Sequence, residues 1–205
     1  MSGELIDVLH LSTLSSLTQM YDCAVMQNSV RSVYLEHQVG LILGEDWRAV
    51  GRDWAPWDFE SAAGVRIELK QSAAKQSWGG PSYSGRFDIA ARRGYYAGAT
   101  FVPDERRFAD VYVFAWHAAT DDGADHRDAS QWEYFVLPES ALPQQKTVSV
   151  DRVRRNERAV RATWRTLRSA VDAVAVTIPA KPSSSFFLRS PSLPSSPPSP
   201  TRHCP

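Results

Sequence analysis

The chain is poor in cysteine and in long apolar segments. Cys23 and Cys204 are the two cysteines among 205 residues, and their wide separation does not match the spacing of zinc ligands. A disulfide scaffold and a structural zinc site are therefore disfavoured. No apolar run approaches the ~20 residues of a membrane span, and the N-terminus lacks the basic segment and hydrophobic core of a secretory signal. We expect a protein of the reducing cytoplasm that does not associate with membranes.

An excess of charge of one sign is also absent. The 23 Lys and Arg residues balance 23 Asp and Glu residues, so the charge of the whole chain gives no indication of an anionic partner. The distribution is less even. Residues 66–107 carry eight bases and four acids, and residues 151–168 carry seven arginines and two acids. A hydrophobic content of 43% is ordinary for a soluble globular domain.

The composition changes abruptly near residue 178. Residues 179–205 contain eight prolines and eight serines, and they have too little apolar surface to offset the entropy cost of ordering. We expect this tail to be disordered. Residues 1–178 are long enough to form one domain with a full hydrophobic core, which would span about residues 28–176.

Two segments in the first quarter of the chain have helical character. Residues 3–22 have poor apolar periodicity and predict a weak helix or an irregular N-terminal arm. Residues 28–44 are apolar nearly all round and end in a glycine, which predicts a buried helix. Glu36 is the acid within this helix. Because a buried carboxylate needs a partner, Glu36 either pairs with a base or faces a polar site.

Two strands and one long helix are expected in the second half. Residues 109–118 are apolar on both parities, as in a central strand that is covered on both faces, and residues 132–137 form a second strand. Asp151 can cap a helix that continues to about residue 176. We interpret the arginines of residues 152–168 as a solvated helix face rather than a nucleic-acid surface, because Arg is a good helix former.

Residues 57–72 combine two short β-like runs with a small-residue turn at 62–64. Side chains alternate along a strand, so Glu68 and Lys70 point to the same face. The turn places Asp58 directly opposite Glu68, and opposed residues in an antiparallel pair have Cβ atoms about 5 Å apart. Two carboxylates at that distance repel each other unless positive charge lies between them. The pattern therefore predicts a divalent cation at Asp58 and Glu68, with Lys70 beside it.

Asp58 followed across a short hairpin by Glu68-Leu69-Lys70 resembles the signature of the PD-(D/E)XK nuclease superfamily, which includes many restriction endonucleases. The upstream helix resembles the first core helix of that superfamily, which often contributes a further catalytic acid, here Glu36. One departure is a Trp between the Pro and the Asp of the signature. The resemblance implies an α/β fold with a restriction endonuclease-like core, a central mixed β-sheet flanked by helices.

The resemblance also implies catalytic roles for these residues. Asp58 and Glu68 would hold Mg²⁺, or Mn²⁺ in its place, with the Leu69 carbonyl as a third ligand. Lys70 would orient the attacking water or neutralise developing charge. Gln71 has the wrong parity to share this face. If the strand bends after Lys70, however, Gln71 would reach the substrate or a metal-bound water.

The implied function is a divalent-metal-dependent endonuclease that hydrolyses phosphodiester bonds in DNA, in restriction, defence or repair. Double-stranded DNA is favoured over single-stranded DNA, and a homodimer or a partner protein would supply specificity. The side chains expected to contact the nucleic acid follow the hairpin, namely Lys75, Gln76, Trp78, Arg106 and Arg107. Arg92 and Arg93 are either further phosphate contacts or solvated charge. Two alternatives stay open: a non-catalytic nucleic-acid-binding module with the same fold, and an interaction domain in which the acids and the lysine form only a cross-strand salt bridge.

Overall fold

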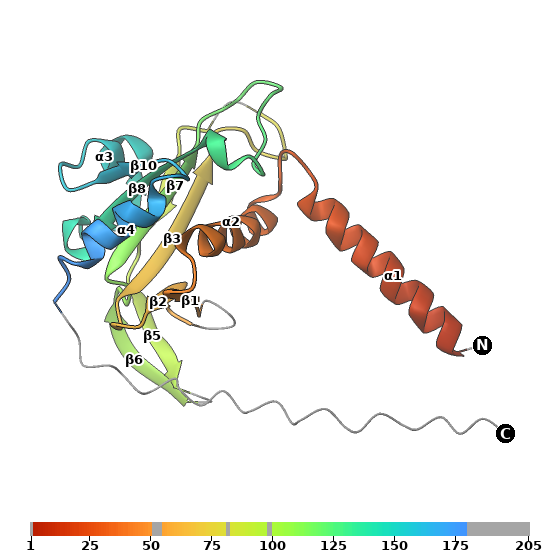
Figure 1. Ribbon diagram of the computed structural model, residues 1–205, viewed down its shortest axis with the longest axis horizontal. Helices are drawn as coiled ribbons and strands as arrows, with labels where there is room; N and C mark the ends of the chain where they lie inside the picture. The colour runs from red at the N-terminus through yellow and green to blue at the C-terminus, as the bar shows by residue number, and fades with distance from the viewer. Residues whose placement is uncertain (1, 51–54, 81–82, 98–99, 180–205) are drawn as a thin grey trace.

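A mixed β-sheet lies at the centre of the computed structural model, which describes residues 2–50, 55–80, 83–97 and 100–179 (Figure 1). Its strands lie side by side in the order β1 (Trp47–Ala49), β2 (Phe59–Ser61), β3 (Arg66–Ala73), β7 (Val111–His117), β8 (Trp132–Pro138) and β10 (Val160–Ala162). β3 and β7 pair in parallel, and the other neighbours in this sheet are antiparallel. The expected disorder of the proline- and serine-rich tail concerns residues that, beyond position 179, lie outside the described ranges.

The two faces of the sheet have different covers. One face packs against the helices α2 (Asn28–Leu43) and α4 (Leu167–Ala175). The other face packs against the short helix α3 (Val150–Arg154) and a separate two-stranded sheet of β4 (Arg86–Asp88) and β9 (Thr147–Ser149). The expected α/β fold, a central mixed sheet flanked by helices, is confirmed.

The predicted central strand is confirmed in β7. Every residue from Val111 to His117 is buried. Alternate side chains enter different apolar clusters, Val113 on the side of α2 and α4 and Phe114 on the side of α3. This explains why the strand is apolar on both parities, since both of its faces are covered. The strand predicted at residues 132–137 is also present, as β8.

The helix predicted over residues 28–44 forms, but its burial is one-sided. Leu35 and Val39 are fully buried against the sheet, whereas Val33 is 42% exposed and Leu41 is 85% exposed. The interpretation of a helix buried all round was wrong. α2 lies on one face of the sheet, so its outer side meets solvent whatever its hydrophobicity.

The single long helix predicted over residues 151–176 is not formed. The segment contains α3, then the strand β10, then α4. Ser149 rather than Asp151 caps α3, and its hydroxyl accepts a hydrogen bond from the Arg152 amide. Helical periodicity is interrupted because β10 pairs antiparallel with β8, which brings Val160 opposite Val136. This pairing gives hydrogen-bond partners to backbone groups along the edge of β8. The stabilisation comes from a contact distant in the sequence, so the local apolar periodicity does not predict it.

The N-terminal segment is a regular helix, α1 (Ser2–Tyr21), and not an irregular arm. It projects away from the sheet (Figure 1), and its large apolar side chains from Ile6 to Met20 are exposed. In the part of the chain that the structure describes, no helix is long and apolar enough to cross a membrane.

The connection between β3 and β7 borders the candidate site. Parallel neighbours require a crossover, which is commonly an α-helix. Here residues 74–110 supply it with β4 and with a hairpin of β5 (Arg92–Ala97) and β6 (Thr100–Arg106), and their described residues contain no helix. The crossover passes over the β3 face that carries Glu68 and Lys70, since its residues line a cavity together with them.

Candidate active site

The hairpin of β2 and β3 has the register expected from its small-residue turn. Phe59 pairs with Ile67. Gly64 turns the chain with a φ of 76°, a conformation that glycine adopts without the strain caused by a Cβ atom. The strand pairing ends at Phe59, and Asp58 comes directly before it, close enough to Glu68 for the charge of Glu68 to raise the pKa of Asp58. The two carboxylates therefore lie close together, one directly before β2 and the other on β3.

Asp58 lies directly before β2 and binds β3 through both its backbone and its side chain. Its amide donates to the Ile67 carbonyl at 2.8 Å, and its Oδ2 accepts a hydrogen bond from the Leu69 amide at 2.6 Å. The Asp58 carboxylate thereby accepts the backbone hydrogen bond of Leu69 at the point where β2 no longer pairs with β3. Burial, and then the charge of Glu68, raise the pKa of Asp58 to about 7, while the bond from Leu69 lowers it. The two carboxylates are close enough to repel each other.

Glu68 is the centre of a compact cluster of charges. The residue is 4% exposed. Its Oε1 accepts hydrogen bonds from Lys70 Nζ at 2.6 Å and from Arg92 Nη2 at 3.2 Å. Lys70 comes from the same strand face, as alternation predicts, whereas Arg92 comes from the crossover. One buried carboxylate oxygen thus binds two cations, while a second carboxylate, that of Asp58, lies close by.

A cavity of about 230 Å³ opens beside Glu68 and Lys70. Asp88 and Arg92 line it from the crossover, and Tyr112 lines it from β7. Burial, followed by the charge of Glu68, raises the pKa of Tyr112 well above its usual value, so its hydroxyl stays protonated. Asp88 and Tyr112 were not predicted from the sequence. Tyr112 pairs with Glu68 in the parallel register, and that relation follows only once the pairing of β3 with β7 is known.

Glu36 approaches this site from α2. It is half-buried, and its charge is a further cause, after burial and Glu68, of the raised pKa of Asp58. Within the described ranges, no three His, Cys, Asp or Glu side chains gather closely enough to hold a metal ion. Glu36 therefore acts on Asp58 through its charge but does not join the two carboxylates as a third ligand in this arrangement. A cation here would depend on Asp58, Glu68 and backbone oxygen.

Gln71 lies on the opposite face of β3. The strand keeps a regular register with β7 to its last residue, so the bend after Lys70 on which the expected access of Gln71 to the substrate depended is not present. Gln71 Oε1 accepts a hydrogen bond from Arg31 at 2.7 Å, and its Nε2 donates to Asn28 at 3.0 Å. Gln71 thus fastens the start of α2 to β3.

Arg31 is a buried guanidinium that has no carboxylate partner among the described residues. It is 1% exposed, and burial lowers its pKa to about 10. Its hydrogen bonds go to three side-chain amide oxygens, those of Asn28, Gln71 and Gln76. Gln76, expected to contact nucleic acid, is therefore committed to an internal bond.

Three of the expected nucleic-acid contacts lie at the surface and differ in their partners. Lys75 donates to the Asp121 carbonyl at 2.6 Å. Arg106 pairs with Asp104 at 2.7 Å. Trp78 is 73% exposed, which leaves its ring accessible to a base or to another partner.

Arg107 is buried, contrary to its expected role as a phosphate contact. Its side chain is 5% exposed and pairs with Glu139 at 3.1 Å. It also donates to the carbonyls of Ile89 at 2.7 Å and Pro143 at 2.6 Å. These bonds join the crossover to the segment that follows β8. Arg107 therefore supports the wall of the cavity from within.

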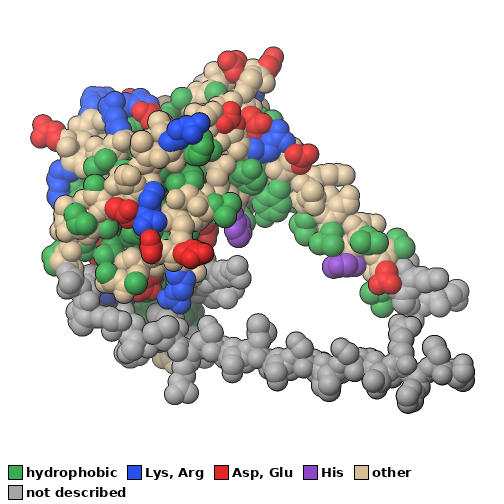
Figure 2. Space-filling view, viewed as in Figure 1, with side chains coloured by type: hydrophobic (Ala, Val, Ile, Leu, Met, Phe, Trp, Pro, Cys, Tyr) green, Lys and Arg blue, Asp and Glu red, His purple; other side chains and the backbone are tan. Residues whose placement is uncertain are grey.

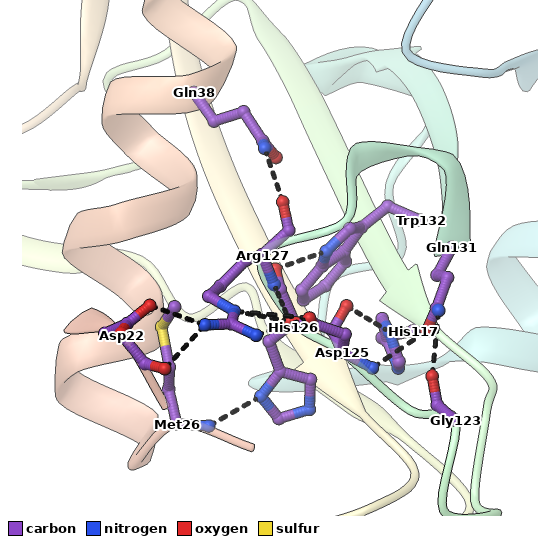
Figure 3. Close-up of polar contacts among 10 residues, drawn as sticks. All are labelled: Asp22, Met26, Gln38, His117, Gly123, Asp125, His126, Arg127, Gln131 and Trp132. Atoms are coloured by element: carbon purple, nitrogen blue, oxygen red, sulfur yellow. Dashed lines mark hydrogen bonds and ion pairs between the residues drawn. The ribbon is translucent and has the colours of Figure 1, made fainter. Parts of the chain in front are cut away.

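A second polar cluster joins the loop after β7 to the start of α2 (Figure 3). His117 and His126 are fully buried, with ring centroids 4.9 Å apart. His126 Nδ1 accepts a hydrogen bond from the Met26 amide at 3.0 Å, and the His126 carbonyl accepts one from Trp132 at 3.0 Å. An acceptor role at Nδ1 requires the neutral ring.

Acid is expected to destabilise the fold through His126. Burial, followed by the positive charges of Arg31 and His117, lowers the pKa of His126 from 6.5 to about 4. The unfolded chain therefore takes up this proton at higher pH than the folded chain does. The free energy of unfolding should be unaffected above pH ~6.5 and should decrease by up to about 3 kcal/mol as the pH falls toward 4. Urea unfolding at a series of pH values measures this slope.

The matched variant for this prediction is His126→Asn. Its amide oxygen can still accept the bond from Met26, but the side chain does not titrate. We expect lower stability at pH 7 and a shallower slope below pH ~6.5. An unchanged slope in His126→Asn would contradict the assignment.

The description of the site rests on the contacts within this chain alone. No protein-family model matches the chain, and no match was found among curated proteins. The resemblance to PD-(D/E)XK nucleases therefore depends on Asp58, Glu68, Leu69 and Lys70 and on their placement in the hairpin.

Proposed function

We propose that this protein is a divalent-metal-dependent endonuclease that hydrolyses phosphodiester bonds in DNA. The observation that carries the proposal is the closeness of the Asp58 and Glu68 carboxylates, with Lys70 bound to Glu68 at 2.6 Å beside a cavity of about 230 Å³. Two neighbouring carboxylates and an ammonium group, with Glu68 and Lys70 lining a cavity, are groups suited to phosphodiester hydrolysis with a hard cation.

The donor atoms fit a hard divalent cation. Burial and the charge of Glu68 raise the pKa of Asp58 to about 7, so a cation between the two carboxylates would relieve an unfavourable interaction. Mg²⁺ is typically held by one or two carboxylates together with waters and phosphate oxygens. Asp58, Glu68 and the Leu69 carbonyl would hold it, and Mn²⁺ would substitute. When bound, such an ion supplies an activated water and polarises the phosphate.

The side chains around the cavity would orient the substrate and balance its charge. The Leu69 amide fixes the Asp58 carboxylate. Glu68 holds Lys70 and Arg92 at the cavity. There, two fixed positive charges would bind phosphate oxygens and offset the negative charge that develops as the bond breaks. Tyr112, kept protonated, offers a neutral hydrogen-bond donor beside them.

The substrate class and the setting follow from the family resemblance. Duplex DNA is favoured over a single strand, and the setting would be restriction, defence or repair. A homodimer would let both strands be cut, and a partner protein would supply sequence specificity.

A non-catalytic nucleic-acid-binding module is the second candidate. The observation that favours it is the internal balance of charge, because Lys70 and Arg92 both already pair with Glu68. Such a cavity could bind a phosphate without a metal ion and without turnover.

The direct test is cleavage by a Lys70→Met variant, which keeps the length of the side chain and removes its charge. Plasmid, linear duplex and single-stranded DNA are incubated with Mg²⁺, Mn²⁺ or EDTA. We expect the wild type to cut only with a divalent ion. The variant should be slower by at least about 100-fold, the scale for losing one electrostatic partner of a transition state.

The control is Arg165→Gln, which removes an exposed cation that stacks on Trp164 at the opposite face of the sheet. It should cleave as the wild type does. Metal-dependent cleavage that survives in Lys70→Met would place the chemistry elsewhere. DNA binding without cleavage under every metal condition would favour the binding module.

A further inference from the structure

Among the surface arginines without an acidic partner, three lie close together in the sequence, and we call them the arginine patch: Arg152, Arg158 and Arg161. All three are exposed. None of them forms an ion pair with a described residue. Their guanidinium groups bind neutral oxygens, at 3.2 Å on Gln145, 3.3 Å on Ser140 and 3.1 Å on the Arg154 carbonyl.

Some other surface arginines have an acid close by, although Arg86, Arg93 and Arg165 are also exposed without an ion pair to a described residue. Arg168 pairs with Asp172 at 2.7 Å, and Arg127 pairs with Asp125 at 2.8 Å. Figure 2 shows Lys and Arg side chains gathered at the upper left of the molecule, where α3 and β10 lie in Figure 1. The patch therefore presents positive charge that the chain itself does not neutralise.

The helix propensity of Arg, the simplest structural explanation for these arginines, does not apply in this fold. On one long helix they would be accounted for by the helix propensity of Arg. Instead Arg152 lies on the five-residue helix α3, Arg158 lies in a loop and Arg161 lies on β10. Protection of a sheet edge by charge explains Arg161 at most. A shared external partner would account for all three.

Arg161 of the arginine patch faces the same side of the sheet as Lys70, and α3, which carries Arg152, packs on that side. Lys70 pairs with Phe114, Phe114 pairs with Phe135, and Phe135 pairs with Arg161. Residues paired in register share a face, and three strand spacings of ~4.8 Å separate Lys70 from Arg161 by about 14 Å along the sheet. This separation is close to the width of the DNA major groove, about 12 Å.

We propose that the arginine patch binds the sugar–phosphate backbone of the DNA whose scissile phosphate lies at the Glu68/Lys70 cavity. The identity of the polyanion rests on the proposed function. A duplex fits better than a single strand, because cavity and patch would meet phosphates on two sides of one groove. Arg presents a planar set of donors that matches phosphate oxygens, and each neutralised phosphate releases condensed counterions.

The test compares two double variants in the non-cleaving Lys70→Met background. Arg152→Gln with Arg158→Gln removes two charges from the patch. Arg48→Gln with Arg165→Gln removes two charges elsewhere on the surface. The dissociation constant for a short duplex is measured by fluorescence anisotropy across a range of salt concentrations. The patch variant should lower the slope of log K against log salt by about 1.8, that is ~0.9 for each lost phosphate contact, and should bind at least about tenfold more weakly at low salt.

Each outcome bears on one proposal or the other. A reduced slope in the patch variant, with a wild-type slope in the control, supports the patch. Equal slopes in both variants overturn the patch and leave the proposed nuclease intact if Lys70→Met has lost cleavage. A patch-dependent slope in a protein that never cleaves DNA overturns the nuclease and keeps the patch as a nucleic-acid surface. Absence of any duplex binding overturns the patch.

Discussion

Asp58→Asn is expected to abolish metal-dependent cleavage and, above pH 7, to make the protein more stable. The amide oxygen can still accept the bond from the Leu69 amide, which is 2.6 Å long in the wild type. The substitution removes a charge that burial and Glu68 disfavour. We expect the free energy of unfolding to rise by about 1–3 kcal/mol. Cleavage should fall by at least about 100-fold, because one of two carboxylates is lost.

The gain in stability should depend on pH in a defined direction. Burial and then Glu68 raise the folded-state pKa of Asp58 to about 7, whereas the ordinary value is 3.8. The folded chain therefore keeps this proton over a range in which the unfolded chain releases it. The stability that results is present below pH ~4 and is lost as the pH rises through 7. Wild type and Asp58→Asn should converge near pH 4 and separate at pH 8, as measured by urea unfolding.

A surface acid provides the control for this variant. Glu133 pairs with Arg154 at 2.7 Å, and its side chain is 37% exposed. Glu133→Gln should change stability by no more than about 1 kcal/mol and leave cleavage unchanged. An Asp58→Asn protein that is less stable than the wild type at pH 8 and still cleaves DNA would contradict both expectations.

Arg107→Met is expected to destabilise the fold strongly. The Arg107 side chain is 5% exposed and holds Glu139 at 3.1 Å. It also donates to two backbone carbonyls, at 2.7 and 2.6 Å. Removing the guanidinium leaves these acceptors without a partner at a poorly hydrated place, with a loss of about 3–5 kcal/mol. Urea unfolding measures this loss.

The neighbouring residue is the matched control. Arg106 has a side chain that is 49% exposed, and its partner Asp104 is also partly exposed, so Arg106→Met should cost less than about 1 kcal/mol. Equal losses in the two variants would show that Arg107 does not hold the crossover to the segment after β8. Arg107→Met should also weaken DNA binding through distortion of the cavity wall, an effect that Arg106→Met lacks.

These two expected effects have different physical origins. Asp58 carries an unfavourable charge that the proposed cation site would use, so neutralising it should raise stability and lower the proposed activity. Arg107 carries a favourable charge that the chain uses internally, so neutralising it costs stability. Burial alone does not separate the two roles. The sign of the neighbouring charges does, since Asp58 faces Glu68 and Arg107 faces Glu139.

Much of the fold follows from local pattern. The central strand β7 was predictable because a strand covered on both faces is apolar on both parities. The hairpin of β2 and β3 was predictable because a small-residue turn sets which residues stand opposite each other. α2 was predictable in its bounds, from its periodicity and its terminal glycine, but not in its burial, because the exposure of Leu41 depends on what lies outside the helix.

The segment at residues 151–176 shows where local pattern fails. Apolar residues at helical spacing are present, yet β10 interrupts them because β8 offers an edge at that point. The outcome changes the meaning of the arginines in this segment, which lie on a short helix, a loop and a strand rather than on one helix face.

By itself, the sequence determined that Asp58, Glu68 and Lys70 share one place, because strand alternation and turn length act over a few residues. The tertiary structure alone decided what surrounds them. Arg92 reaches Glu68 from 24 positions away, and Tyr112 lies beside Glu68 through the parallel pairing of β3 with β7. Such contacts depend on the path of the crossover and on strand order, which no local spacing encodes.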